Sequence, residues 1–143
     1  MNLSFHIATD AELGAVNARY AAIGFLPSKQ GELIVVASLD GQLAGQGRVE
    51  PIDARSGELG GIYVLPALAG RGVARQIVDF LIRQTQLPHL YCLPFSDLAG
   101  FYGSMGFAPV GDHATVAHQI QQKFEWCKTS YDQPVLLLER AAA

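Results

Sequence analysis

A glycine-rich loop is the segment of this sequence best suited to bind an anion. Residues 64–74 read VLPALAGRGVA and place Gly70 and Gly72 between an apolar run and an amphipathic one. Backbone N–H groups at the start of a helix lack an intrahelical partner and favour a phosphate group. Glycine lets such a group come close because it has no Cβ. The loop therefore predicts a phosphate-binding turn, and a simple tight turn is the alternative.

Two widespread phosphate loops do not fit this segment. A dinucleotide fingerprint needs a third glycine where Arg75 stands, and an acidic residue about 20 positions later, near Phe95. A Walker loop needs the run Gly-Lys-Ser/Thr, which the sequence lacks. The predicted anion site therefore belongs to neither class.

A second motif, FYGSMGF over residues 101–107, follows the loop. The two segments together resemble the signatures of the GNAT superfamily of N-acetyltransferases: Val-x-Pro followed by Arg/Gln-x-x-Gly-x-Gly/Ala, and Phe/Leu-Tyr-x-x-x-Gly-Phe. They occur in the family's order with a predicted strand between them, so the resemblance covers nearly the whole chain and is weakest over 112–133. The matching residues of the first signature are Val64, Pro66, Gly70, Gly72 and Ala74.

The resemblance implies a fold and an activity. The fold would be an α/β one, in which helices flank a central mixed, mostly antiparallel sheet with a splayed pair of parallel strands, and residues 1–143 would form a single domain. The enzyme would transfer the acetyl group of acetyl-CoA to a primary amine by direct attack in a ternary complex, without a metal. We expect a small-molecule acceptor because the sequence has no acidic stretch to receive a basic peptide. A peptide acceptor is the alternative.

The resemblance also assigns residues to acetyl-CoA. The pyrophosphate would lie on the backbone amides of residues 70–74, with Arg71 or Arg75 as its charged partner, and the preceding strand would supply donors for the thioester oxygen. Two positions depart from the family pattern: Ala69 replaces Arg or Gln, and Phe95 replaces an asparagine for which Ser96 would substitute. The expected cosubstrate-binding residues are Ile62, Tyr63, Val64, Ala69, Gly70, Arg71, Gly72, Val73, Ala74, Arg75, Ser96 and Tyr102.

Acetyl transfer to an amine also needs acid–base chemistry. An alkylamine with a pKa near 10.4 is almost wholly protonated at pH 7, so a base, or a site that binds the neutral amine, is required. By the resemblance, Glu58 would be the base and Tyr102 the acid that protonates the leaving sulfur. The alternatives are an exposed glutamate at a strand end and an ordinary tyrosine on a short helix.

The other reactive side chains give weaker indications of a catalytic or binding role. Cys92 is expected to pack in a buried strand, and no activated cysteine or serine nucleophile is visible, which agrees with direct attack. Phe124, Trp126 and Tyr131 would either wall an acceptor pocket or pack in the core or an interface. The histidines show no metal-ligand spacing and are expected to be structural or exposed; they are His6, His89, His113 and His118.

Apolar periodicity predicts the elements that position these residues. Thr9 to Glu12 has the spacing of a capping box, Asp40-Gly41 favours a two-residue hairpin turn, and Gly60-Gly61 indicates a bulge. Strands are predicted over 3–8, 32–39, 42–50, 58–65, 89–94, 107–111 and 134–140. Helices are predicted over 9–22, 71–86, 97–104 and 114–128, the last with Val116, Ile120, Phe124 and Cys127 on one face.

Composition limits the partners and the location. Half of the 143 residues are hydrophobic and 16% are charged, with a net charge of −3 and no basic run, which argues against nucleic acid or an anionic membrane as a partner. The first ten residues lack a secretion-signal pattern and no apolar run is long enough to span a bilayer, so we expect a cytoplasmic protein. The apolar surplus over 114–138 favours a homodimer. The rival functions are an acyl-CoA sensor without turnover and an unrelated α/β binding module.

Overall fold

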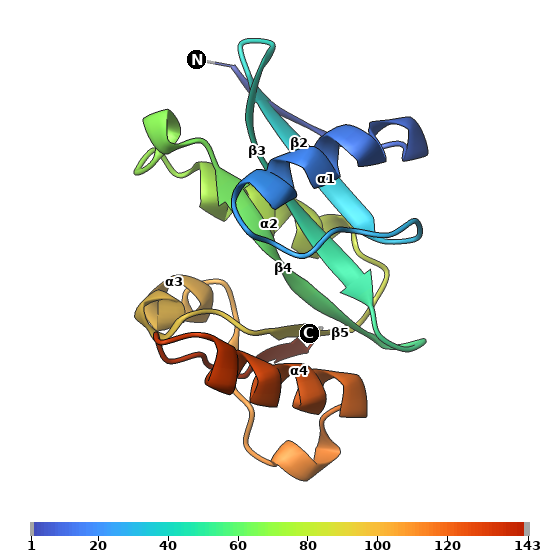
Figure 1. The fold of residues 1–143 in the computed structure, drawn as a ribbon, viewed down its shortest axis with the longest axis vertical. Coiled ribbons are helices and arrows are strands. Elements are labelled where there is room, and N and C mark those ends of the chain that lie inside the picture. The colour runs from blue at the N-terminus through green and yellow to red at the C-terminus, as the bar shows by residue number, and fades with distance from the viewer. Residues whose placement is uncertain (1, 142–143) are drawn as a thin grey trace. The chain divides into compact units, whose positions relative to one another are not determined.

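The computed structural model describes residues 2–141, whose seven strands form one mixed sheet in the order β1-β2-β3-β4-β5-β7-β6 (Figure 1). The parallel pair is β4 with β5, and β1–β2, β2–β3, β5–β7 and β6–β7 are antiparallel. This confirms the predicted mixed α/β fold. The strands are β1 (Leu3–Ile7), β2 (Leu33–Leu39), β3 (Gln42–Pro51), β4 (Ser56–Val64), β5 (His89–Cys92), β6 (Ala108–Pro109) and β7 (Leu138–Ala141). The helices are α1 (Leu13–Ala22), α2 (Val73–Gln84), α3 (Ala99–Gly103) and α4 (His118–Ser130).

The chain divides into two compact units. Unit 1 comprises Met1–Glu50 and Gly61–Thr85, and unit 2 comprises Pro51–Gly60 and Gln86–Ala143. Strand β4 therefore begins in unit 2 and ends in unit 1. The single-domain organisation expected from the sequence stays a prediction.

In unit 1, helix α1 packs on one face of strands β2 and β3. Val16 and Tyr20 of α1 form a buried cluster with Ile34 and Val36 of β2. Gln46 of β3 pairs with Val36 in the ladder and is fully buried, and its side-chain amide donates a 3.2 Å hydrogen bond to the carbonyl oxygen of Val16. The hydrogen bond satisfies a polar group that would otherwise destabilise this face of the core.

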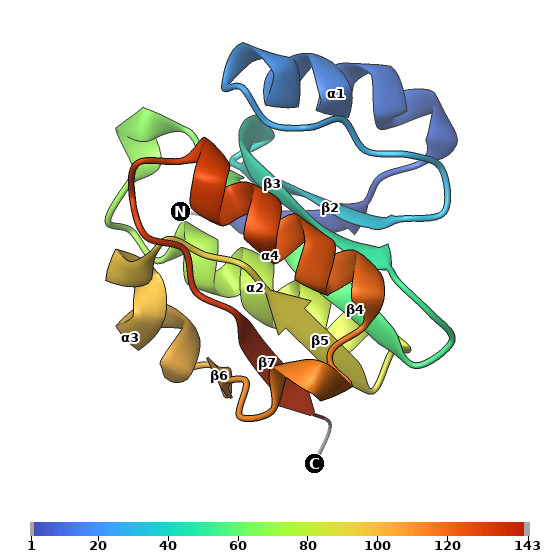
Figure 2. The same ribbon diagram turned by 60° about the horizontal axis from the view of Figure 1, so that its bottom comes forward.

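Helix α2 covers the opposite face of the same strands (Figure 2). Val35 and Ala37 alternate with the residues beneath α1 and therefore point to this face, as do their partners Gly47 and Gly45. A Cβ at Gly47 would lie 2.8 Å from Cγ2 of Ile77 in α2. The two glycines thus allow α2 to pack close to β3. The buried side chains of α2 are Val73, Ile77, Val78 and Leu81.

In unit 2, helix α4 packs on strands β5 and β7. The parallel ladder between β4 and β5 covers Ser56–Glu58, and β7 runs antiparallel to β5 on its other side. A buried cluster joins Ile120 of α4 to the segments around it; its members are Tyr91, Val110, Val116, Ile120 and Leu137. Phe124 packs against this cluster, so the predicted apolar face of the 114–128 segment is turned to the core.

The local turn and cap signals are confirmed. The backbone N–H of Thr9 donates to the carboxylate of Glu12 at 3.0 Å within a capping box. Asp40 and Gly41 both have positive φ, +50° and +81°, as a two-residue hairpin turn of this kind requires. Gly61 has a φ of +61°, which marks the irregular point predicted in β4.

Two predicted elements differ from the structure. The helix expected over 114–128 is a short 3-10 turn, His113–Thr115, followed by α4, because Val116 and Ala117 are extended with ψ of 140° and 137°. The strand expected over 134–140 begins as a ladder only at Leu138, and Val135 forms an isolated bridge with Phe95. Val116 and Val135 are both buried in the core. Their packing there holds the backbone in an extended, irregular conformation, although the local sequence pattern predicts a helix at the first position and a regular strand at the second.

Among residues 2–141, no helix combines the length and the apolar character that crossing a bilayer requires.

Candidate functional site

The glycine loop in unit 1 presents an unobstructed helix N-terminus. A 3-10 turn, Pro66–Leu68, leads to Gly70 and Gly72, both with a φ of +78°. The first bond of α2 runs from the N–H of Gln76 to the carbonyl of Gly72 at 3.2 Å, so the N–H groups of residues 73–75 precede the helical ladder. No heavy atom lies within 4 Å of a Cβ built on either glycine. The positive end of the helix dipole and the open space at both glycines fit the phosphates of a nucleotide-like cosubstrate.

A buried tyrosine binds the backbone of β4 at Gly61, ahead of this loop. The hydroxyl of Tyr20 donates a 2.7 Å hydrogen bond to the carbonyl oxygen of Gly61. A Cβ at Gly61 would lie 2.6 Å from that hydroxyl and 2.8 Å from Nε of Arg48, so only glycine fits here. Burial raises the pKa of Tyr20 to about 12. The backbone before residues 62–64, the predicted donors to the thioester oxygen, is therefore fixed by α1.

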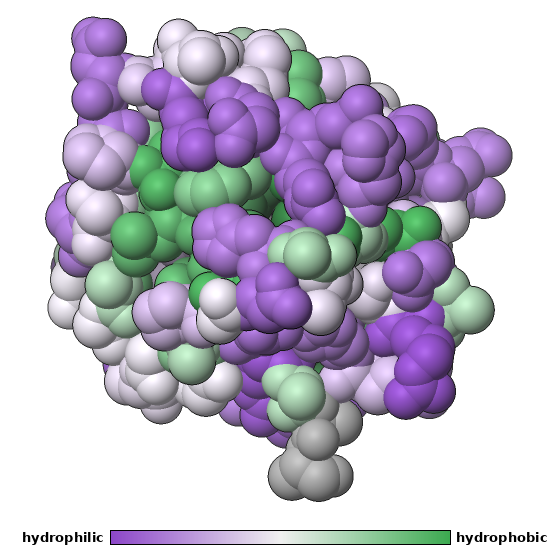
Figure 3. Space-filling model, turned by 90° about the horizontal axis from the view of Figure 1, so that it is seen from below, coloured by the Kyte–Doolittle hydropathy of each residue, from purple (hydrophilic) through white to green (hydrophobic). Residues whose placement is uncertain are grey.

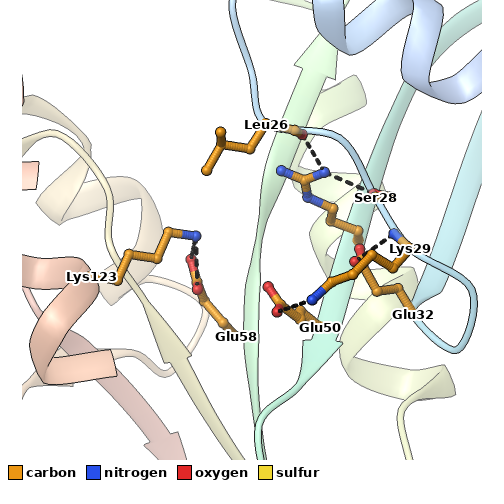
Figure 4. A network of polar contacts seen from close by, with 8 residues as sticks. Leu26, Ser28, Lys29, Glu32, Glu50, Glu58 and Lys123 are labelled. Carbon is orange, nitrogen blue, oxygen red and sulfur yellow. Dashed lines mark hydrogen bonds and ion pairs between the residues drawn. The ribbon is translucent and has the colours of Figure 1, made fainter. Parts of the chain in front are cut away.

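The Arg48 side chain anchors the loop that follows α1. One of its terminal nitrogens donates to the carbonyl of Leu26 at 2.8 Å and to the hydroxyl of Ser28 at 2.7 Å (Figure 4). Its guanidinium also stacks 4.4 Å over the ring of Tyr20. Asn17 adds a reciprocal pair of hydrogen bonds to the backbone of Ser28, at 2.9 and 2.7 Å. This loop of unit 1 is thus tied to both α1 and β3.

In unit 2, Glu58 lies buried on β4 and binds a lysine. Only 8% of Glu58 is exposed, and Nζ of Lys123 in α4 lies 2.9 Å from one carboxylate oxygen and 2.8 Å from the other (Figure 4). The register pairs Glu58 with Tyr91, whose side chain faces α4. Glu58 is therefore not the exposed strand-end residue of the alternative interpretation.

Sequence reasoning missed Lys123, although its position carries a signal. It follows Ile120 by three residues and precedes Cys127 by four, so it lies on the apolar stripe of the helix. A charged residue on such a stripe predicts a buried partner of opposite charge.

Tyr102, the predicted acid, is buried in α3 with 5% of its surface exposed. Burial, together with the neighbouring Cys92, raises the pKa of Tyr102 well above its ordinary value. Cys92 follows Tyr91 on β5 and so points to the opposite face of the strand. Within unit 2, the structure therefore places Glu58 beneath α4 and the Tyr102 hydroxyl at the other face.

Neither cysteine is primed as a nucleophile. Burial raises the pKa of Cys92, and it raises the pKa of Cys127 as well. A thiol in such surroundings remains protonated and packs as a small apolar group, because the reactive form is the thiolate. The packing role predicted for Cys92 agrees with its 2% exposure.

Four other residues considered in the sequence, Phe95, Ser96, His6 and His89, have contacts within their own unit. The ring of Phe95 lies edge-on to that of Tyr131 at 5.3 Å, and the N–H of Ser96 donates to the carbonyl of Pro134 at 2.9 Å. His6 and His89 pair with carboxylates at 2.8 Å. Over residues 2–141, no three or more His, Cys, Asp and Glu side chains gather where a metal ion could be held.

The aromatic residues of the 114–138 region do not all belong to the core. Trp126 and Tyr131 are 47% and 43% exposed and contact each other edge-on at 5.7 Å, so the core-packing interpretation is wrong for these two. On the face drawn in Figure 3, apolar side chains gather in one area among hydrophilic ones. The homodimer suggested by the apolar surplus stays a prediction.

Comparison with known protein families shows which family the chain belongs to. The family model described as "Acetyltransferase (GNAT) domain" matches residues 30–109, more than half of the chain. The protein belongs to the GNAT acetyltransferase family. The domain that this family model describes is an acetyltransferase domain. The matched segment contains the glycine loop, Glu58 and Tyr102, whereas Lys123 lies beyond it.

Solved structures show the same fold at low identity. The protein Rv2747 from Mycobacterium tuberculosis, in complex with coenzyme A, is 18% identical with a TM-score of 0.74, and the alignment covers 98% of this chain and 99% of that one. An acetyl-CoA-bound GNAT acetyltransferase from Elizabethkingia anophelis is 15% identical with a TM-score of 0.66, over 98% of both chains.

An N-acetylglutamate synthase from Neisseria gonorrhoeae, complexed with coenzyme A and N-acetyl-glutamate, is 16% identical with a TM-score of 0.72. The alignment covers all of this chain but only 36% of the synthase, so the GNAT chain spans about a third of that protein's length. No curated protein sequence matches the chain significantly.

The predicted site residues of this GNAT protein fall in both units. Those from Ile62 to Arg75 belong to unit 1, whereas Glu58, Ser96 and Tyr102 belong to unit 2. Unit 1 contains the glycine loop and the Tyr20–Gly61 contact that precedes it, and unit 2 contains a buried carboxylate, Glu58, and a buried phenol, Tyr102.

Proposed function

We propose that this GNAT protein transfers the acetyl group of acetyl-CoA to the primary amine of a small molecule by direct attack in a ternary complex. The observation that carries the proposal is the Glu58 carboxylate, buried and bound through both oxygens to a primary amine. Acyl transfer needs such a group, because the ammonium form of the acceptor has no lone pair for the attack.

Glu58 is the proton acceptor in this proposal. A general base must lie about 2.6–3.2 Å from the nitrogen whose proton it takes, and the contacts of Glu58 with Lys123 at 2.8 and 2.9 Å satisfy that range. A carboxylate that holds an ammonium through both oxygens is placed to take its proton.

The residues of unit 1 bind and orient the cosubstrate. Acetyl-CoA supplies the acetyl group as a thioester. The backbone amides of residues 70–74 are proposed to hold its pyrophosphate, with Arg71 or Arg75 as the charged partner at the same loop. Donors on residues 62–64 are proposed to stabilise the negative charge that develops on the carbonyl oxygen. The anchored Gly61 keeps those donors in place.

Tyr102 is proposed to donate a hydrogen bond to the sulfur that leaves. Its raised pKa keeps the hydroxyl protonated and able to donate a hydrogen bond. A phenol whose pKa lies far above that of a thiol, about 8.5, stabilises the thiolate without giving up its proton. This refines the acid role expected from the sequence to that of a donor.

The bound ligands of structural relatives support a small acceptor. The Neisseria synthase was solved with N-acetyl-glutamate, an acetylated amino acid. Together with the absence of an acidic run in the sequence, this favours a small amine over a basic peptide.

The test combines binding with turnover. Calorimetry should show that acetyl-CoA binds, and a panel of small amines should then release free thiol. Glu58→Gln should lower kcat/KM by about 100-fold while leaving acetyl-CoA affinity unchanged, because only proton transfer is lost. Glu125→Gln, an exposed carboxylate paired with Lys128, is the matched control. Binding without thiol release over a broad panel would instead indicate a sensor, and an active Glu58→Gln would mean that another group takes the proton.

A further inference from the structure

The contact between Lys123 and Glu58 has the geometry of a bound substrate amine. Lys123 ends in a primary alkylammonium, which is the chemical group of the proposed acceptor. Its Nζ lies within hydrogen-bond distance of both carboxylate oxygens, at 2.9 and 2.8 Å. The side chain of Glu58 is only 9% exposed, whereas that of Lys123 is 31% exposed. The carboxylate is thus fixed in the core, and the ammonium reaches it from a side chain that extends toward solvent.

Neither of the other two lysines has such a partner. Lys29 approaches Glu50 at 3.8 Å with 76% of its side chain exposed. Lys128 pairs with Glu125 at 2.8 Å, but the two side chains are 46% and 69% exposed. Exposed pairs like these contribute little, because water competes for both partners. Of the three lysines, Lys123 has the ammonium that binds a buried carboxylate.

We propose that Lys123 occupies the acceptor's ammonium site at Glu58 and must leave it before an acceptor amine can bind. The inference rests on the proposed function of Glu58 as the base that receives the acceptor. Both oxygens of the carboxylate already contact one ammonium, and a second ammonium beside Lys123 would meet a like charge in a poorly solvated place. Substitution of one amine for the other keeps the buried charge neutralised throughout.

The position of Lys123 makes that exchange feasible. Its flexible four-carbon stem extends from α4 and is partly exposed, so the ammonium can move into water without unfolding the helix. While it is bound, its ammonium lies against both oxygens of the buried Glu58 carboxylate. Lys123 is thus a specificity-determining residue: an acceptor must offer an amine that competes with an internal lysine, which disfavours neutral and anionic nucleophiles.

Chemical rescue tests the site without any need for catalysis. Lys123→Ala removes the ammonium from a buried carboxylate and should lower the melting temperature. Ethylamine and n-butylamine, added at constant pH and ionic strength, should then raise the melting temperature in a saturable manner, because they bind the folded state alone. Ethanol and n-butanol should not. The wild type and Lys128→Ala should respond only at about tenfold higher amine concentration, and the double variant Lys123→Ala/Glu58→Gln should show no saturable effect. Absence of rescue in Lys123→Ala, or equal rescue in Lys128→Ala, overturns the proposal.

A second variant keeps the test valid if Lys123→Ala does not fold. Lys123→Met preserves most of the stem volume without the charge, and Lys128→Met is its matched control. If the lysine leaves the site open for a tenth of the time, its removal lowers the acceptor's KM about tenfold. Lys128→Met should match the wild type. An unchanged or raised KM in Lys123→Met overturns the proposal.

Failure of the proposed function and failure of the inference about Lys123 give different experimental results. If wild type releases thiol with an external amine but no alkylamine rescues Lys123→Ala, the proposed function stands and the inference about Lys123 is wrong. If no variant releases thiol yet alkylamines rescue Lys123→Ala, the ammonium site at Glu58 exists and the proposed transfer to it is what fails.

Discussion

The hydroxyl of Tyr20 and the carbonyl oxygen of Gly61, 2.7 Å apart, join a helix near the N-terminus to the bulge of β4. The tyrosine is fully buried, and the glycine has a φ of +61°, which a side chain rarely adopts. The contact therefore fixes an irregular backbone point whose position affects every residue that follows it on β4. Its removal should influence both stability and cosubstrate binding.

Tyr20→Phe should destabilise the protein by about 1–2 kcal/mol, because the carbonyl of Gly61 loses its buried donor. Chemical denaturation measures this free energy directly. Acetyl-CoA affinity should fall as well, since donors on residues 62–64 depend on the bulge. Tyr131→Phe, which changes an exposed side chain, serves as the control and should leave both quantities unchanged. Equal unfolding curves for wild type and Tyr20→Phe would contradict the anchoring role.

The raised pKa of Tyr20 predicts an alkaline loss of stability. Its pKa is about 12 in the folded state and about 10 when unfolded, so the unfolded chain releases this proton first. The stabilisation is complete below pH 10 and is lost as pH rises towards 12, amounting to roughly 2–3 kcal/mol. Because the raised pKa of Tyr102 acts in the same direction, the measurement is the difference between wild type and Tyr20→Phe across this range. That difference should shrink between pH 10 and 12.

Two glycine-to-alanine changes should shift stability in opposite directions. A Cβ at Gly45 would collide with the backbone carbonyl of Tyr63, which cannot move freely, so Gly45→Ala should cost about 1–3 kcal/mol. Gly14 lies within α1 with no atom within 4 Å of the added Cβ. Gly14→Ala should therefore stabilise the protein by about 0.5–1 kcal/mol. Thermal unfolding of both variants decides the matter, and a stabilising Gly45→Ala would mean that β3 and β4 are further apart than described.

Gly72→Ala should separate ligand binding from backbone strain. The added methyl group meets open space in the protein but would obstruct a phosphate at the loop, and we expect acetyl-CoA affinity to fall about tenfold or more. Gly24→Ala is the matched control, because Gly24 has a φ of +75° and equally open surroundings beyond the end of α1. Both variants should lose similar stability, and only Gly72→Ala should lose affinity in calorimetry. Equal affinities would place the pyrophosphate elsewhere.

Tyr102→Phe should lower kcat by about 10- to 100-fold if its hydroxyl stabilises the leaving sulfur. Acetyl-CoA affinity should remain within about twofold, because the ring is retained. Since burial raises the pKa of Tyr102, the hydroxyl stays protonated through pH 10, and wild-type kcat should show no loss from its ionisation below that pH. Turnover at wild-type rate in Tyr102→Phe would assign this residue to packing alone.

Local chemistry predicted much of the fold. Thr9 and Glu12 make a capping box within four residues, and Asp40-Gly41 makes its turn within two, so each conformation depends on its neighbours alone. The conformation of residues 116–117 and 134–137 was harder to predict. Their extended backbone reflects burial of Val116 and Val135 against distant parts of unit 2. Periodicity cannot distinguish a helix from an extended segment that happens to bury the same residues.

In the candidate site, too, local features were predictable from the sequence and long-range contacts were not. The phosphate loop is a local feature, and its glycines, helix start and open surroundings follow from eleven consecutive residues. The pair of Glu58 and Lys123 joins residues 65 apart, and the pair of Tyr20 and Gly61 joins residues 41 apart. Such contacts depend on strand register and helix placement, which composition and spacing do not determine.

The passage of β4 from one unit to the other has a consequence for biosynthesis. Because unit 1 ends at Thr85, all of its residues have been synthesised before β5 begins at His89. The first half of β4, which unit 2 needs for its parallel ladder with β5, must therefore wait while the second half is already able to fold. A fragment that ends at residue 85 and has been released from the ribosome should resist proteases over residues 61–85 while residues 51–60 are still cleaved.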